Sequence, residues 1–126
     1  MAIRRHVVSV TTAADGSATA YSPSLIRGGK IAAIHYIKTD YADGVDFTIT
    51  SEGTGETIWT ESNVNATDYC YPRAPTHSNA GVAALYAAAG TAVNDLIRLG
   101  SGDRVKIVLA QGGNAKVGAF HIVVED

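Results

Sequence analysis

Two runs of alternating apolar and polar residues near the C-terminal end constrain the fold more than any other feature of the sequence. In residues 104–111 and 116–125, apolar side chains recur at every second position, as Val105, Ile107, Leu109, Phe120, Ile122 and Val124. A period of two is typical of β-strands that bury one face. A Gly-Gly-Asn sequence at 112–114 separates the two runs. The pattern predicts a two-stranded β-ribbon closed by a glycine-rich turn.

The same alternation recurs in shorter runs along the rest of the chain. Between turn-forming Gly, Asp, Asn and Pro residues it predicts strands at 6–11, 17–21, 30–39, 45–50 and 57–61. The run 30–39 is largely apolar at both its odd and its even positions. That composition is typical of a strand that is covered on both faces.

Two later segments are less regular. Residues 62–79 are rich in Asn, Pro, Ser and Thr, which predicts a long loop of the kind that is often functional or mobile. Residues 81–93 are rich in alanine and leave two interpretations. One is a short helix, and the other is a strand around 84–86, a turn at 88–90 and a strand at 93–99. A glycine inside this short span favours the strands.

About eight strands in a chain of 126 residues point to one fold class. This length is normal for a single domain, and such a domain buries about two thirds of the surface that its unfolded chain exposes. We predict an all-β, single-domain β-sandwich over residues 1–126, jelly-roll-like, because two facing sheets then share one core and leave few edges exposed. Residues 1–6 are either an N-terminal arm that lies on a partner or an edge strand of the domain's own sheet.

Composition argues against several classes of protein. Hydrophobic residues make up 46% of the chain and charged residues 17%, so the surface is poor in charge and suited to packing against another protein. A net charge of −2 with scattered basic residues argues against nucleic-acid binding. The single cysteine, Cys70, excludes an internal disulfide. No apolar stretch reaches the length of a membrane span or of a signal peptide, so we expect a chain made in the cytoplasm and not processed.

No motif for catalysis, a cofactor or a metal ion stands out. Asp40, Asp43 and Asp46 lack the spacing of a calcium loop, and the four histidines are far apart in sequence. A nucleophile elbow and a Walker sequence are both missing. We therefore expect a protein that is not an enzyme and that carries no cofactor or metal.

Candidate contact residues are few, and they are chosen by side-chain type and position. Aromatic rings and arginine provide large contact areas at low entropic cost and are enriched at binding hot spots. These candidates are the adjacent basic pair Arg4 and Arg5, Trp59, and the loop residues Tyr69, Tyr71 and Arg73. For Trp59 a place in the core is the equal alternative.

Several segments together resemble small structural proteins of tailed bacteriophages, and in particular capsid decoration, or cement, proteins. The segments are 29–36, 46–50, 71–73, 103–113 and 120–123. This resemblance implies a compact β module, jelly-roll-like in several members, that binds the exterior of an assembled icosahedral capsid as a homodimer or homotrimer. Its partner would be the major capsid protein, whose neighbouring subunits it clamps. The chain would be made in the host bacterial cytoplasm and end up in the virion.

Two other functions remain open at the level of sequence. One is a carbohydrate-binding jelly roll on a virion, with Trp59, Tyr69 or Tyr71 as stacking platforms for sugar rings. The other is a tail or neck component of the same particle, because similar β modules are reused there.

Overall fold

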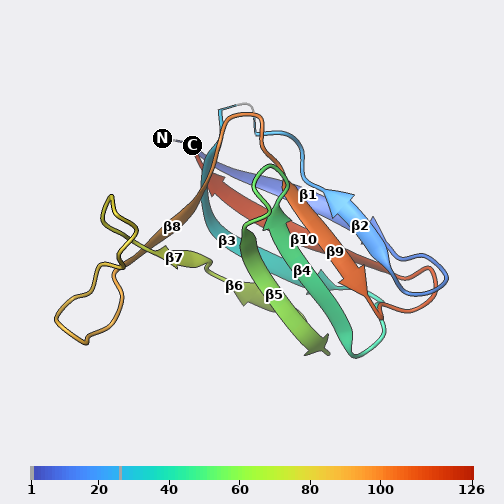
Figure 1. Cartoon of the computed structure of the whole chain (residues 1–126). Helices are drawn as coiled ribbons and strands as arrows, with labels where there is room; N and C mark the ends of the chain where they lie inside the picture. The colour runs from blue at the N-terminus through green and yellow to red at the C-terminus, as the bar shows by residue number, and fades with distance from the viewer. Residues whose placement is uncertain (1, 26) are drawn as a thin grey trace.

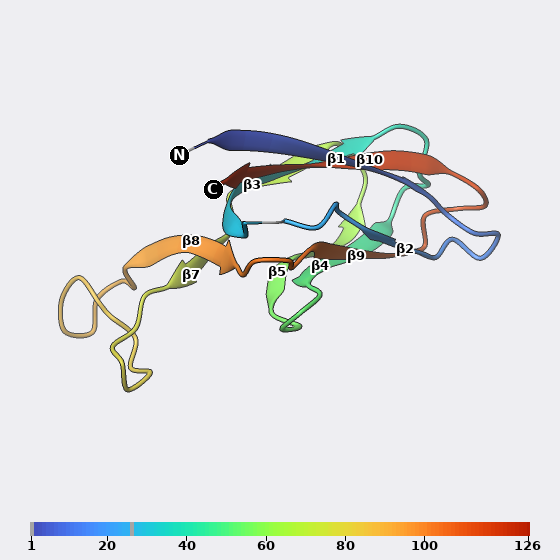
Figure 2. The same cartoon turned by 90° about the horizontal axis from the view of Figure 1, so that it is seen from above.

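The computed structural model describes residues 2–25 and 27–126 as two antiparallel β-sheets packed face to face, and it confirms the predicted all-β sandwich (Figures 1 and 2). The described residues form ten strands and no helix. The strands are β1 (Ile3–Thr11), β2 (Ala18–Tyr21), β3 (Gly29–Lys38), β4 (Val45–Ser51), β5 (Thr57–Val64), β6 (Asp68–Cys70), β7 (Arg73–Pro75), β8 (Asn94–Leu99), β9 (Val105–Ala110) and β10 (Val117–Glu125).

The order of the strands is that of a jelly roll. One sheet has the order β1-β10-β3-β8-β7, with β6 also paired to β3, and it faces a four-stranded sheet with the order β2-β9-β4-β5. The consecutive strands β1 to β4 alternate between the two sheets, and so do β8 to β10. The chain therefore wraps around one shared core.

The predicted ribbon between residues 104–111 and 116–125 is wrong, although both strands exist. β9 pairs with β2 and β4 in one sheet, whereas β10 pairs with β1 and β3 in the other. Positive φ angles of 61° at Gln111 and 91° at Gly113 bend the connection across from sheet to sheet. Alternation predicts which face of a strand is buried, but it does not say which strand lies beside it.

The predicted loop at 62–79 and the predicted strand at 84–86 are also wrong. β5 continues to Val64, and β6 and β7 lie within the supposed loop. Residues 84–86 belong to no strand. β6 pairs with residues 34–36 of β3, and β8 pairs with residues 29–31 along the same edge. One strand position of the sheet is thus shared between β6 and β8. Between β7 and β8 the chain leaves the sandwich and returns.

Arg73 stabilises the edge of β3 where this strand position is interrupted. Its Nη1 donates hydrogen bonds to the carbonyl oxygens of Ala32, at 3.2 Å, and Pro72, at 2.7 Å. Ala32 lies between the two paired segments of β3. The Arg73 guanidinium therefore donates to a backbone carbonyl that pairs with neither β6 nor β8.

The first residues of the chain belong to the sandwich. β1 pairs with β10 in an unbroken register from Ile3 opposite Glu125 to Thr11 opposite Val117. Of the two alternatives for residues 1–6, the described residues 3–6 therefore form an edge strand and not a separate arm. Met1 lies outside the described residues.

Aromatic rings from both sheets meet in the core. Tyr36 and Phe120 come from the six-stranded sheet, and Phe47 and Trp59 come from the four-stranded sheet. The Phe47 ring centroid lies 5.2 Å from those of Tyr36 and Phe120 and 4.8 Å from that of Trp59. Each such pair adds about 0.5–1.5 kcal/mol beyond the burial of its area. These contacts join the two layers.

Tyr41 closes one end of this core. Its hydroxyl donates a 2.5 Å hydrogen bond to the carbonyl of Val10, and its ring stacks on Tyr36 at 6.1 Å. A Cβ placed on Gly118 would lie 2.2 Å from the ring, so only glycine fits beneath it. The buried hydroxyl of Tyr36 has no hydrogen-bond partner among the described residues, and burial raises the pKa of this group to about 12.

These two tyrosines are expected to respond differently to the loss of the hydroxyl. Tyr41→Phe should lower the free energy of unfolding by about 1 kcal/mol, because the bond to Val10 is lost. Tyr36→Phe should leave it unchanged or raise it, since no bond is lost. Urea denaturation of both variants measures the difference, and a larger loss at Tyr36 would contradict this assignment.

Asp103 ties the turn after β4 to the turn before β9. Its carboxylate accepts hydrogen bonds from the Ser51 hydroxyl at 2.5 Å, the Gly53 amide at 2.9 Å and the Arg104 amide at 2.7 Å. Burial alone would raise the pKa of Asp103, but the three hydrogen bonds outweigh burial and lower the pKa below its usual value.

The lowered pKa of Asp103 in the folded protein makes the stabilisation by these hydrogen bonds sensitive to acid. The stabilisation is present above the unfolded pKa of 3.8 and is lost as the pH falls through the folded pKa. Asp103→Asn should therefore reduce stability at neutral pH and flatten the decline of stability in acid. Urea midpoints measured across the acidic range test this. Ser51→Ala should act in the same direction to a smaller extent, and an unchanged acid decline in Asp103→Asn would refute the assignment.

Candidate functional site

A segment that projects from the sandwich is the first candidate surface. Residues 76–93, called the arm below, run from the end of β7 to the start of β8 and extend away from the two sheets (Figures 1 and 2). Its base is closed by the Thr76 amide and hydroxyl, which donate to the carbonyl of Val93 at 2.7 and 2.8 Å. Beyond the base, isolated β-bridges join His77 to Ala83 and Leu85 to Ala92.

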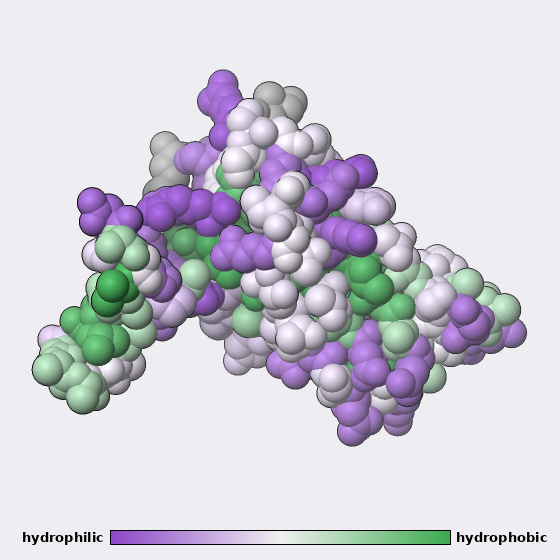
Figure 3. Space-filling view, viewed as in Figure 1, coloured by the Kyte–Doolittle hydropathy of each residue, from purple (hydrophilic) through white to green (hydrophobic). Residues whose placement is uncertain are grey.

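The arm is apolar and exposed. No residue from 74 to 94 is Asp, Glu, Lys or Arg, and none of the arm residues is buried. Val82, Leu85 and Tyr86 are exposed, with 76% of Tyr86 accessible to solvent. Figure 3 shows hydrophobic residues gathered on this projection, while hydrophilic residues are frequent on the body beside it. Exposed apolar surface of this kind marks contact sites.

The outer face of the six-stranded sheet, directed away from the core, is the second candidate surface. The strand registers place Val7 beside His121, His121 beside His35, and His35 beside Tyr69. These four side chains form a row across β1, β10, β3 and β6. Val7 is 53% exposed and Tyr69 is 60% exposed, and the Tyr69 ring stacks on His35 at 5.9 Å.

The prediction that residues 30–39 are covered on both faces is therefore wrong for this chain on its own. Tyr36 and Ile34 of β3 face the core and are fully buried. His35 and Ile37 on the opposite face are only partly buried, and no strand of the described residues lies over them (Figure 2). The apolar pattern that predicted a second layer instead belongs to a free face.

Three of the predicted contact residues lie on this outer face or beside it. Tyr69 and Tyr71 are exposed neighbours, with ring centroids 5.6 Å apart in an edge-on arrangement. Arg5 is exposed on β1 and points to the same side as Val7. The structure thus places Arg5 and the tyrosine pair on one side of the molecule, with β10 and β3 between them.

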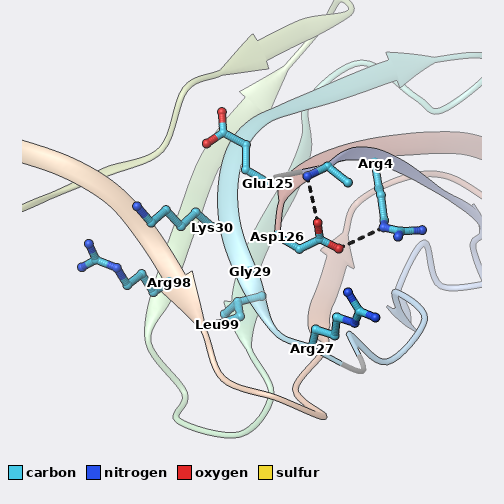
Figure 4. A pocket seen from close by; sticks show the side chains of 9 residues that line it. Arg4, Arg27, Gly29, Lys30, Arg98, Leu99, Glu125 and Asp126 are labelled. Carbon is cyan, nitrogen blue, oxygen red and sulfur yellow. Dashed lines mark hydrogen bonds and ion pairs between the residues drawn. The ribbon is translucent and has the colours of Figure 1, made fainter.

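Arg4 lies elsewhere, in a pocket of about 630 Å³ at one end of the six-stranded sheet that is lined mainly by charged residues. Figure 4 shows Arg4 and Arg27 on one side of Asp126, and Lys30 and Arg98 on the other. Arg4 donates to the Asp126 carboxylate at 3.0 Å, and this bond holds the pKa of Asp126 below its usual value. Arg4 thus already has an internal partner.

Two of the predicted contact residues have internal roles. Trp59 is only 7% exposed, and its indole nitrogen donates to Glu61 at 3.2 Å, so its side chain belongs to the core. Of the two alternatives for Trp59, the structure shows the core. Arg73 supports the interrupted edge of β3 through its two backbone hydrogen bonds.

The apolar residues of the arm are not among the contact residues predicted from the sequence. The signal was present as the complete lack of charge between Arg73 and Asp95. This signal was ambiguous, because an uncharged alanine-rich stretch equally fits a buried helix or strand.

The two candidate surfaces provide exposed apolar and aromatic side chains for contact rather than reactive groups. Within the described residues no group of three or more His, Cys, Asp or Glu side chains is arranged to hold a metal ion. Burial, followed by the charges of Glu61 and Asp68, raises the pKa of the Cys70 thiol and so disfavours the reactive thiolate. The described residues also contain no helix long and apolar enough to cross a bilayer.

Comparisons with known proteins do not identify a relative. No protein-family model, no curated protein and no solved structure matches this chain.

Proposed function

We propose that this protein is a non-enzymatic structural protein of a virion that binds the outer surface of an icosahedral phage capsid and stabilises contacts between major capsid protein subunits. The observation that carries the proposal is the exposed, uncharged arm at residues 76–93. The resemblance of the sequence to capsid decoration proteins supplies the kind of partner.

The exposed apolar surface of the arm is unfavourable in the isolated protein, and it becomes favourable when a partner buries it. Burying a side chain such as Leu85 or Val82 contributes about 1.5–3 kcal/mol relative to leaving it exposed. The arm has no charged side chain that would have to be desolvated in a contact. Burial against a partner therefore gains free energy at little electrostatic cost.

The rest of the sandwich gives the arm a rigid support. β7 and β8 pair from Arg73 opposite Leu96 to Pro75 opposite Asn94, and β8 also pairs with β3. The outer face of the same sheet carries Tyr69 and Val7. A molecule that contacts one capsid subunit through its arm and another through this face stabilises their assembled arrangement, because both contacts form only when the subunits are in register. Many copies on one shell add avidity.

The arm is expected to be required for binding to shells. Leu85→Asp and Tyr86→Asp each place a carboxylate in the apolar contact, and either should abolish saturable co-sedimentation with empty capsids of the cognate phage. Val108→Asp is the matched control, since Val108 is an exposed apolar residue on β9 in the other sheet. It should bind as the unmodified protein does.

All three substitutions lie at exposed positions, so their thermal unfolding midpoints should remain close to that of the unmodified protein. Equal binding by all variants would contradict a role for the arm. An unmodified protein that does not bind capsids at all would overturn the proposed function. A copy number of about a dozen per virion, instead of hundreds, would indicate the tail or neck.

The exposed tyrosine pair supports one other candidate, a carbohydrate-binding function. Tyr69 and Tyr71 are accessible and close together, and aromatic rings are common platforms for sugars. Their edge-on arrangement lets only one ring lie flat on a given sugar. A glycan array that gives no signal, together with saturable capsid binding, favours the structural function. Glycan binding that is lost in Tyr69→Ala and not in Leu85→Asp would favour the alternative.

A further inference from the structure

β1 is an edge strand that has neither the proline nor the bulge that commonly protects an edge against pairing, although it carries Arg4 and Arg5. It has nine residues, it pairs with β10 without a register shift, and it contains no proline. Its other edge carries backbone amide and carbonyl groups that pair with no strand of the described chain. Long, regular edges of this kind add a further strand readily.

The other edge strands of the two sheets are protected. β6 and β7 have three residues each, β7 ends in Pro75, and β2 has four residues. β5 has eight residues, but its pairing with β4 shifts register twice, and Asn63 within it has a φ of 56°. Short length, proline and bulges each discourage edge pairing. Among the described edges β1 is therefore the one open to a partner strand.

Only one antiparallel register pairs all nine residues of β1 with a second copy of β1. In an antiparallel pair centred on Val7, each Val7 lies opposite Val7, Arg5 lies opposite Ser9, and Ile3 opposite Thr11. All nine residues are then paired, and no arginine faces an arginine. A pair centred on Arg5 would place two guanidinium groups directly opposite each other, which is unfavourable.

This pairing also joins the outer faces of the two copies. A two-fold axis perpendicular to the sheet keeps residues of odd number on the same side in both chains. The row Tyr69, His35, His121 and Val7 then continues through Val7 of the second copy to its Tyr69. Val7 passes from a half-exposed edge position to the centre of this joined face.

We propose that the protein forms a symmetric homodimer through antiparallel pairing of its β1 strands, with Val7 at the two-fold axis. The partner is a second copy of this chain, and the product is one continuous sheet across both molecules. The dimer requires no capsid, so it is tested with the purified protein alone.

Sedimentation equilibrium measures the association directly. A strand pair buries less area than a standard interface, so we expect a weak dimer. Monomer and dimer should exchange reversibly, with the dimer populated at protein concentrations up to about 100 µM. The mass should rise from 13.1 kDa to twice that value. Val7→Lys should weaken the dimer about tenfold, because it places two ammonium groups opposite each other. Val108→Lys, at a 39% exposed valine in the other sheet, should dimerise normally.

Disulfide trapping tests the register. In a Cys70→Ser background, Val7→Cys should cross-link on mild oxidation, because directly opposite Cα atoms lie about 4.5–5.5 Å apart and this spacing suits a disulfide. Ser9→Cys is the matched control on the same face of β1. In the proposed register two Ser9 residues are separated by four positions along the strand, about 13 Å, so they should not cross-link.

Each outcome decides the proposal. A wild-type protein that stays monomeric at these concentrations would overturn it, as would a dimer or trimer that Val7→Lys leaves intact. Preferential cross-linking of Ser9→Cys over Val7→Cys would reject the register. Circular dichroism and the unfolding midpoint verify that each variant is folded. A failure of capsid binding would leave the dimer standing, and a monomer that binds capsids would leave the proposed function standing.

Discussion

The contact between aromatic rings of the two sheets is the interaction on which the rest of the structure depends. Phe47 lies against Tyr36, Phe120 and Trp59, and thus joins rings carried by β4, β3, β10 and β5. Each of these strands must present its alternate side chains to the same interior, which fixes the face that it buries. Once this face is fixed, the opposite face of the six-stranded sheet is necessarily left outside.

The sequence predicted the kind of fold because half-buried strands carry their own signal. Val45, Phe47 and Ile49 of β4 are buried as the alternation indicates, and β9 and β10 lie close to their expected bounds. The neighbours of each strand were not predictable from the same signal. Residues 112–114 suit a hairpin turn as well as a crossing between sheets, and the choice is made by contacts far away in the chain.

The candidate site was predictable only where exposure follows from side-chain type and local sequence. Tyr69 and Tyr71 follow that rule. Trp59 does not, because a large ring in an alternating strand serves equally well in a core. Arg73 was expected to meet a partner, yet the interruption of β3 pairing gives it backbone acceptors within its own chain. The arm escaped prediction because apolar, uncharged sequence usually signals the interior.

The base of the arm has a consequence for engineering. Thr76 and Val93 are held together by two hydrogen bonds, so the polypeptide departs from the scaffold and rejoins it at almost one point. The entropic penalty for closing a loop across such a point grows slowly, by about 0.6 kcal/mol for each doubling of its length. Foreign peptides of different lengths can therefore be grafted between these two residues, and the jelly roll becomes a carrier that displays them outward.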